Sequence, residues 1–291
     1  MSHTTSLCPI VYLNGEYLPW EQAKISVLDR GFLFGDSVYE VIPAYAGRLF
    51  HADKHIERLQ RSMEKIRLNL NWDTAKWLMT LQKLVELNGG GNLSLYLQVT
   101  RGCDLIRYHL FPENMQPTIV AFCTPYQPMS YEELNQGFSA ITADDIRWKR
   151  CDIKATSLLP NILLRQQAHD AGAVEAILIR DGYAVEASSS NIFIVKEGCL
   201  ITPPLNNHLL GGTTRDIILE LARVNGINYR EELISLAELQ SADEIWLSGA
   251  SKLIMPVTQL DGKPVANGQP GLVWQKIFRL FQSYIKRLCS E

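Results

Sequence analysis

The 291-residue sequence lacks most of the features that mark membrane, secreted or nucleic-acid-binding proteins. It has no apolar run near the roughly 20 residues that a membrane-spanning helix needs, and its first residues show no basic region followed by an apolar segment. Its net charge of −3 provides no electrostatic attraction to nucleic acid or membrane surfaces. The six cysteines form no CxxC pair and no metal-ligand spacing. We therefore expect reduced thiols, no metal site and a cytoplasmic location.

The composition is that of a globular chain with a sizeable core, since 46% of the residues are hydrophobic and 20% are charged. A chain of this length favours two domains of unequal size. The segment from Pro125 to Met129 is rich in proline and polar residues, which favours a linker. We expect a smaller N-terminal domain over residues 1–124, a linker over 125–130 and a larger C-terminal domain over 131–291.

Short patterns predict helices and strands in both parts of the chain. Asn14-Gly15 between two apolar segments predicts a β-hairpin, and apolar spacing predicts a helix from Asp53 to Leu68. Gly31 to Asp36 and Ser248 to Ser251 are expected to be irregular. The other predicted helices span residues 73–87, 160–169, 214–224 and 271–287, and the other predicted strands 38–45, 93–100, 118–123, 138–141, 175–179, 192–195 and 244–247. The result is a mixed α/β fold of the α+β type.

Two features indicate chemistry without reference to any family. Lys154 lies in an apolar-flanked stretch and is a candidate amine nucleophile, although an ordinary exposed lysine is the commoner outcome on the flanking residues alone. Thr213 and Thr214 open a predicted helix directly after Gly211-Gly212. Such a helix start directs backbone N–H groups and the positive end of the helix dipole at an anion.

Taken together, Asp152-Ile153-Lys154, the run from Glu186 to Phe193, and the run from Gly211 to Asp216 resemble the class IV (fold type IV) pyridoxal-phosphate-dependent aminotransferases. Within that family the sequence is most similar to the D-amino acid aminotransferases. The resemblance extends from Asn14 to about Ile277. It implies two domains with pyridoxal 5'-phosphate between them, and amino acids and 2-oxo acids as substrates.

The resemblance also implies roles for individual residues. Lys154 would form the Schiff base and carry the catalytic proton, Glu186 would lie beside the ring nitrogen, and Arg58 would bind the phosphate. The other residues expected at the cofactor are Ser188, Ser189, Ser190, Leu210, Thr213, Thr214, Gly249 and Ala250. The sequence departs from the D-amino acid aminotransferase pattern at Pro43, at Leu253 and in the hydroxyl-poor Gly249-Ala250 loop.

Tyr39, Arg107 and His109 are the residues expected to bind the substrate. The Arg-x-His spacing resembles the carboxylate trap of the D-specific members, in which the loop reaches the partner subunit's active site. An arginine can pair with a carboxylate through two parallel hydrogen bonds, which fixes its orientation. This resemblance implies a homodimer.

The resulting hypothesis is ping-pong transamination of D-amino acids, with D-alanine and 2-oxoglutarate giving pyruvate and D-glutamate. A branched-chain L-amino acid aminotransferase is one alternative, since it shares the lysine and glutamate motifs. Aminodeoxychorismate lyase, which uses the same cofactor in the 4-aminobenzoate branch of folate synthesis, is another. A catalytically silent binding or scaffold protein is a third, and the intact Lys154, Glu186 and Arg58 argue against it.

Overall fold

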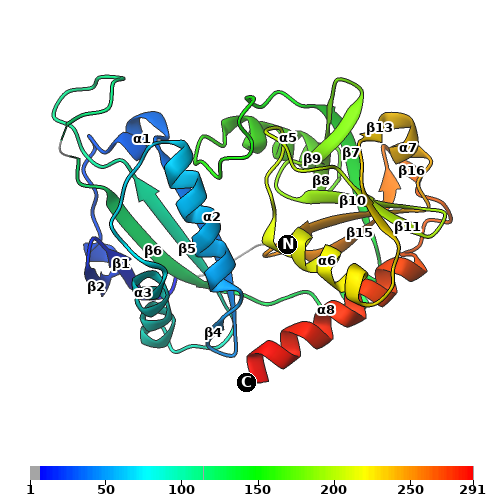
Figure 1. Ribbon diagram of the computed structural model, residues 1–291, viewed down its shortest axis with the longest axis horizontal. Coiled ribbons are helices and arrows are strands. Elements are labelled where there is room, and N and C mark those ends of the chain that lie inside the picture. The colour runs from blue at the N-terminus through cyan, green and yellow to red at the C-terminus, as the bar shows by residue number, and fades with distance from the viewer. Residues whose placement is uncertain (1–6, 114, 291) are drawn as a thin grey trace. The chain divides into compact units, whose positions relative to one another are not determined.

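The structure, a computed structural model, describes residues 7–113 and 115–290 (Figure 1). The chain folds as two compact units. The first contains the chain up to Gln127 together with Ile153–Ser157, and the second contains Pro128–Asp152 and the chain from Leu158 onward. The short segment around Lys154 therefore belongs to the first unit, although the sequence analysis assigned it to the C-terminal domain.

The described strands of the first unit form one antiparallel sheet in the order β2-β1-β6-β5-β3-β4. Asn14 and Gly15 both have positive φ at the turn between β1 and β2, which confirms the predicted hairpin. Pro43 lies opposite Ser94 in β3, near the edge of the sheet, where proline is tolerated. The strands β1 to β6 are Ile10–Leu13, Glu16–Pro19, Ser37–Tyr45, Arg48–Leu49, Leu93–Thr100 and Thr118–Pro125.

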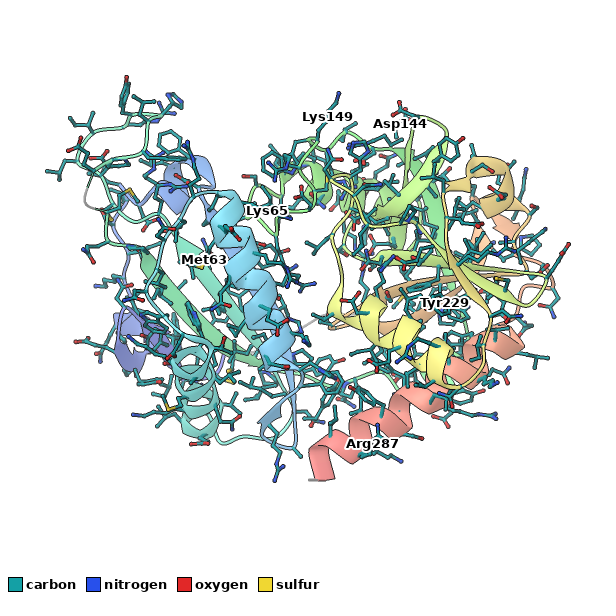
Figure 2. The ribbon with its side chains drawn as sticks, viewed as in Figure 1. Met63, Lys65, Asp144, Lys149, Tyr229 and Arg287 are labelled. Atoms are coloured by element: carbon teal, nitrogen blue, oxygen red, sulfur yellow. The ribbon has the colours of Figure 1, made fainter. Side chains whose placement is uncertain are left out.

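Helices α2 (Ala52–Lys65) and α3 (Thr74–Leu87) pack on this sheet and form the core of the first unit with it. On α2 the side chain of Met63 is buried, whereas Lys65, two residues later, is exposed (Figure 2). This is the amphipathic pattern from which the helix was predicted. The predicted loop at Gly31 was wrong, because α1 (Arg30–Phe34) occupies it and only Gly35 and Asp36 lie outside the helix. A 3-10 turn, η1, spans Trp20–Gln22.

The described strands of the second unit form a larger mixed sheet in the order β12-β11-β10-β14-β15-β7-β8-β9-β13, with β16 paired to β15. Neighbouring strands are parallel at β15-β7, β7-β8 and β11-β12 and antiparallel elsewhere. The strands β7 to β16 are Phe138–Asp144, Glu175–Arg180, Tyr183–Ala187, Asn191–Lys196, Cys199–Thr202, Tyr229–Glu231, Ile234–Ser235, Glu244–Gly249, Leu253–Leu260 and Lys263–Pro264.

Helices α6 (Thr213–Val224) and α8 (Leu272–Ser290) of the second unit pack against each other, and the indole N–H of Trp274 on α8 donates to the carbonyl of Ile254 at 3.0 Å. Trp246 of β14 and Phe193 of β10 are fully buried in the same unit. The helices α4 to α8 span Tyr131–Leu134, Leu159–Asp170, Thr213–Val224, Leu236–Gln240 and Leu272–Ser290. Among the residues described, none of these helices is long and apolar enough to cross a membrane.

Candidate active site

Lys154 lies on a short segment that returns to the first unit and runs beside β3. Ile153 is buried in the core of this unit, and Ala155 forms an isolated β-bridge with Val38. The N–H of Tyr39 donates to the carbonyl of Lys154 at 3.0 Å, and the N–H of Lys154 donates to the hydroxyl of Ser62 at 3.3 Å. The backbone of Lys154 is thus fixed on both sides, between β3 and α2.

The side chain of Lys154 is half-buried and directed at an aromatic ring. Its Nζ lies 4.2 Å from the centroid of the Tyr39 ring, within the range of a cation–π interaction. Tyr39 in turn stacks on Tyr96 with 5.7 Å between ring centroids. The structure therefore brings together two of the residues that the sequence analysis selected, Lys154 and Tyr39.

Arg58 is held by a buried carboxylate that the sequence analysis did not identify. Its Nε and Nη2 donate to the two oxygens of Glu40 at 2.8 and 2.7 Å. The Nδ1 of His55 lies 2.7 Å from Oε2 of the same carboxylate. Glu40 follows Tyr39 in β3, and His55 lies one turn before Arg58 in α2, so the strand and the helix together position the guanidinium.

Burial and the neighbouring charges shift the pKa values of Glu40 and His55 in opposite directions. Burial raises the pKa of Glu40, but the charge and hydrogen bonds of Arg58, assisted by His55, outweigh it and hold that pKa far below its usual range. Burial lowers the pKa of His55, and the neighbouring Glu40 only partly offsets this. Glu40 is therefore a carboxylate and His55 a neutral imidazole at pH 7, which leaves the arginine charge balanced by one anion.

Arg107 and His109 come together in this unit on the ring of Phe34. The guanidinium carbon of Arg107 lies 4.9 Å from the Phe34 centroid, and the His109 ring lies 5.3 Å from it. Both side chains are exposed. The predicted pair of substrate-binding residues is thus adjacent in space and accessible.

Glu186 belongs to the second unit, on β9, where it is almost fully buried. It forms an ion pair with Arg147, accepts from the backbone N–H of Leu210 at 3.2 Å and lies 3.4 Å from Nδ2 of Asn191. Burial raises the pKa of Glu186, and the charge of Arg147 opposes this without cancelling it. Glu186 is therefore a strong hydrogen-bond acceptor, as a partner of a pyridinium nitrogen has to be.

The three serines that follow β9 surround a second buried carboxylate, that of Glu175. The hydroxyls of Ser188, Ser189 and Ser190 all donate to it, at 2.8 and 3.3 Å for the last two. The ammonium of Lys252 forms an ion pair with Glu175 and donates to Ser189 Oγ at 2.7 Å and Ser190 Oγ at 3.1 Å. We refer to these five residues, Glu175, Ser188, Ser189, Ser190 and Lys252, as the serine cluster.

The segment from Leu210 to Thr214 is tied to the surroundings of Glu186. Nδ2 of Asn191 donates to the carbonyl of Leu210 at 2.8 Å. A Cβ at Gly212 would overlap the side-chain oxygen of Asn191, so a larger residue here would displace that side chain. Helix α6 begins at Thr213 and has no side-chain cap at Gly212. Its N-terminus therefore has the dipole and backbone groups that suit an anion.

Gly249 and Ala250 lie at the end of β14, beside the serine cluster. A Cβ at Gly249 would lie 3.8 Å from the carbonyl of Ser189, and Ser248 pairs with Asn191 across the β10-β14 ladder. The ends of β9, β10 and β14 and the start of α6 thus gather most of the predicted cofactor residues in the second unit. Its buried carboxylate, serine hydroxyls and helix N-terminus fit the ring nitrogen and the phosphate of pyridoxal phosphate.

Sequence reasoning missed the residues that hold these groups in place. They are Glu40 and His55 around Arg58, Arg147 and Asn191 around Glu186, and Glu175 and Lys252 in the serine cluster. Each lies at least five residues from its partner in the sequence, and Lys252 lies 77 residues from Glu175. A charged residue in an otherwise apolar strand, such as Glu175 at the start of β8, was the one signal available in the sequence.

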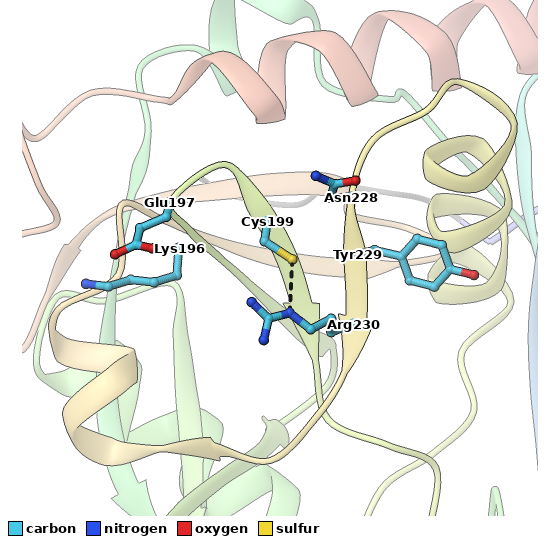
Figure 3. Close-up of a pocket in the computed structure, with 6 residues that line it drawn as sticks. All are labelled: Lys196, Glu197, Cys199, Asn228, Tyr229 and Arg230. Atoms are coloured by element: carbon cyan, nitrogen blue, oxygen red, sulfur yellow. Dashed lines mark hydrogen bonds between the residues drawn. The ribbon is translucent and has the colours of Figure 1, made fainter.

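A hollow of about 430 Å³ lies at the opposite end of β10 (Figure 3). In it the Nε of Arg230 donates to the sulfur of Cys199 at 3.4 Å. Its lining residues are Lys196, Glu197, Cys199, Asn228, Tyr229 and Arg230. None of the residues selected from the sequence lines it, so we do not assign it to the active site.

Comparison with known proteins identifies the family of the chain. Residues 37–260 match the family model for amino-transferase class IV. The chain is 42% identical to the D-alanine aminotransferase of Staphylococcus epidermidis over 277 residues, covering 95% of this chain and 98% of the relative. It is 40% identical to the D-alanine aminotransferase of Bacillus licheniformis over 275 residues, covering 94% of this chain and 96% of the relative.

Among solved structures, the branched-chain amino acid aminotransferase of Escherichia coli matches with a TM-score of 0.90 at 28% identity, over 95% of this chain and 94% of that one. This likeness confirms the predicted mixed α/β architecture of fold type IV. The chain belongs to the class IV aminotransferases, which depend on pyridoxal 5'-phosphate.

Proposed function

We propose that the protein transaminates D-amino acids, with D-alanine and 2-oxoglutarate as the preferred pair and pyruvate and D-glutamate as products. The observation that carries the proposal is the pairing of Arg107 and His109 on one aromatic ring in an exposed loop. The relatives at 42% and 40% identity, which are D-alanine aminotransferases, support it over nearly the whole chain. The proposed reaction is ping-pong: the donor would leave as its oxo acid before the acceptor binds, and the amine of Lys154 would serve both substrates in turn.

Pyridoxal phosphate, when bound, supplies an aldehyde for the amino group and a ring that accepts electrons from the substrate Cα. The amine of Lys154 would hold the aldehyde in the resting enzyme and then transfer the Cα proton as base and acid. The backbone of Lys154 is fixed by Tyr39 and Ser62, so the amine can change position only by rotation about the bonds of its own side chain. Glu186 would hold the proton on the ring nitrogen, a role supported by its burial and its raised pKa.

For the phosphate we propose Arg58, the N-terminus of α6 at Thr213 and Thr214, and the Gly249-Ala250 turn. Arg58 is pre-oriented by its two hydrogen bonds to Glu40. An arginine fixed in this way loses little side-chain entropy when it binds an anion. The serine cluster would lie beside the same group, and Leu210 would pack against the ring.

We propose that Arg107 and His109, with Tyr39, bind the substrate carboxylate. Fixing the side on which the carboxylate lies decides which enantiomer presents its Cα–H to Lys154. Arg107 would supply a paired set of N–H donors and His109 one more. This is why these two residues, rather than Lys154 or Glu186, separate a D-specific from an L-specific enzyme.

We further propose that the protein is a homodimer in which this loop completes the partner's site. The loop carries exposed apolar side chains, with Leu105 91% and Ile106 71% exposed. Apolar groups exposed to this extent on one loop are typical of an interface. Light scattering should give a dimer, and a fully active monomer would contradict the proposal.

A cytoplasmic location is also part of the proposal. It is supported by the cysteines whose side chains are described, Cys8, Cys103, Cys123, Cys151 and Cys199, which are all free thiols. Free thiols persist in reducing compartments.

A branched-chain L-amino acid aminotransferase is the second candidate, favoured by the high TM-score with the E. coli enzyme. The two are separated by coupled assays of the purified holoenzyme with 2-oxoglutarate. The turnover of D-alanine to pyruvate should be much faster than the turnover of L-leucine, L-valine or L-alanine to their oxo acids. Faster turnover of L-leucine would assign the enzyme to the branched-chain group.

A further inference from the structure

The side chains of Arg107 and His109 meet helix α1 at the ring of Phe34. This ring contacts the guanidinium of Arg107 and the imidazole of His109, which are two residues apart. One ring thus serves both groups. The spacing between the two groups therefore depends on Phe34.

The backbone of the loop is held by Arg30, at the other end of the same helix. Its Nη1 donates to the carbonyl of Tyr108 at 2.6 Å, and its Nη2 lies 3.5 Å from the carbonyl of His109. The guanidinium of Arg30 also lies 4.9 Å from the Phe34 centroid. One helix of five residues thus contacts both the backbone and the side chains of the pair.

Arg30 is itself fixed by a shared carboxylate. Oδ2 of Asp36 accepts from Nε of Arg30 at 2.9 Å and from Nε of Arg101 at 2.8 Å. Arg101 then lies 3.7 Å from the centroid of Phe111. The loop is therefore anchored before Arg107, at Arg101, and after His109, at Phe111.

Helix α1 is a rigid base for these contacts because its start is buried. The carboxylate of Asp29 caps it by accepting from the N–H of Gly31 at 2.8 Å and also accepts from the hydroxyls of Thr100 and Thr118. A Cβ at Gly31 would lie 2.5 Å from the methyl of Thr100. Such close packing against β5 leaves the helix little freedom to shift.

We propose that Phe34 is a positioning residue for recognition of the substrate carboxylate: its ring sets the spacing and orientation of Arg107 and His109. This inference rests on the proposed function, since it deepens the role of that pair. Phe34 acts through its contacts with these two side chains. It reduces the conformational freedom of two exposed side chains before the substrate arrives, so the substrate carboxylate does not have to order them.

The test compares Phe34→Leu, Phe34→Tyr and Phe32→Leu in the holoenzyme, with D-alanine as the amino donor. Phe32 lies on the same helix and is 71% exposed, so Phe32→Leu serves as the matched control. Phe34→Leu should raise KM for D-alanine by about tenfold, the size expected for the loss of one cation–π contact and one ring–ring contact, with kcat and cofactor affinity within about twofold. Phe34→Tyr keeps the ring and should restore KM, and Phe32→Leu should leave it unchanged.

A double-mutant cycle with Arg107→Ala supplies a readout that a purely structural role would not move. If Phe34 acts through Arg107, Phe34→Leu should raise KM much less in the Arg107→Ala background than in the wild type. Equal effects in both backgrounds would overturn the proposal, as would loss of cofactor binding or of thermal stability in Phe34→Leu. If wild type turns over D-alanine and Arg107→Ala raises KM while Phe34→Leu does not, this inference fails and the proposed function stands. An unchanged KM in Arg107→Ala would instead contradict the proposed role of the pair.

Discussion

The ammonium of Lys154 lies 4.2 Å from the centroid of the Tyr39 ring, and the N–H of Tyr39 donates to the carbonyl of Lys154 at 3.0 Å. Tyr39 thus contacts both the backbone and the side chain of Lys154. The result is a lysine whose main chain is part of the first unit's sheet edge while its amine remains half-exposed. This is the arrangement that an amine nucleophile needs, since it must be held in place and still be able to reach a substrate.

Lys154→Arg tests whether the amine itself is required. Arginine keeps the cation near Tyr39 and retains the backbone contacts, but it cannot act as a neutral amine nucleophile. We expect unchanged thermal stability, loss of the visible cofactor band and at least a thousandfold fall in transamination, on the order of the loss seen when a catalytic group is removed. Normal turnover by this variant would remove Lys154 from its proposed role.

Glu40→Ala tests the anchor of Arg58. It leaves a buried guanidinium without its carboxylate, so the free energy of unfolding should fall by about 3–5 kcal/mol. Urea unfolding of the holoenzyme measures this. The matched control is Glu57→Ala on the same helix, whose ion pair with Lys54 is exposed and should be worth less than about 1 kcal/mol. Equal losses in both variants would show that the Glu40 pair contributes no more than a surface pair.

His55 should make stability depend on pH. Burial holds its folded-state pKa below the ordinary value of 6.5, so the unfolded chain takes up a proton more readily than the folded one. The stability due to neutral His55 is therefore fully present above pH 6.5 and is lost as the pH falls below it. Glu40 does not contribute in this window, because its depressed pKa matters only near and below 4.5.

The measurement for His55 is the unfolding free energy at pH 7.5 and pH 5.5 for wild type and His55→Gln, which cannot be protonated. Wild type should lose more stability than the variant on acidification. The difference between the two pH curves isolates His55 from the other five histidines, which both proteins share. Parallel curves would contradict the assignment.

Lys252→Met tests the serine cluster. Removing the ammonium leaves the carboxylate of Glu175 buried, with the more distant Arg165 at 3.6 Å as its remaining cation. We expect lower thermal stability and weaker cofactor binding, because Ser189 and Ser190 lose a hydrogen-bond donor. Adding Glu175→Gln should recover much of the stability, since the double variant buries no unpaired charge. Losses that simply add would show that Lys252 does not act through Glu175.

The sequence predicted the elements whose pattern is local. Apolar spacing predicted α2, and Asn14-Gly15 predicted the first hairpin. Helix α1 was missed because two glycines suggested a loop, whereas its stability comes from Asp29 bonding to distant threonines. Strand β15 was missed because Pro256 lies within it, opposite Trp246, and proline argues against an interior strand.

The residues of the candidate site also fall into two groups, those that local motifs predicted and those that only the fold brings together. Lys154, Glu186 and Arg58 could be selected from motifs, because each lies in a recognisable run of residues. Their partners Tyr39, Arg147 and Glu40 become neighbours only after folding. Tyr39 was selected, but as a substrate-binding residue rather than as the partner of the lysine. Side-chain partners of buried charges depend on tertiary structure and leave no fixed spacing in the sequence.

The most direct test of the central claim is a half-reaction with the purified holoenzyme and one amino acid at a time, followed by the visible cofactor band. If Arg107 and His109 select the enantiomer as proposed, D-alanine and D-glutamate should bleach the band while their L forms leave it unchanged. Bleaching by L-leucine or L-glutamate, with no response to the D forms, would contradict the account and assign the enzyme to the branched-chain group. No response to any of these amino acids would also contradict it and would favour the lyase.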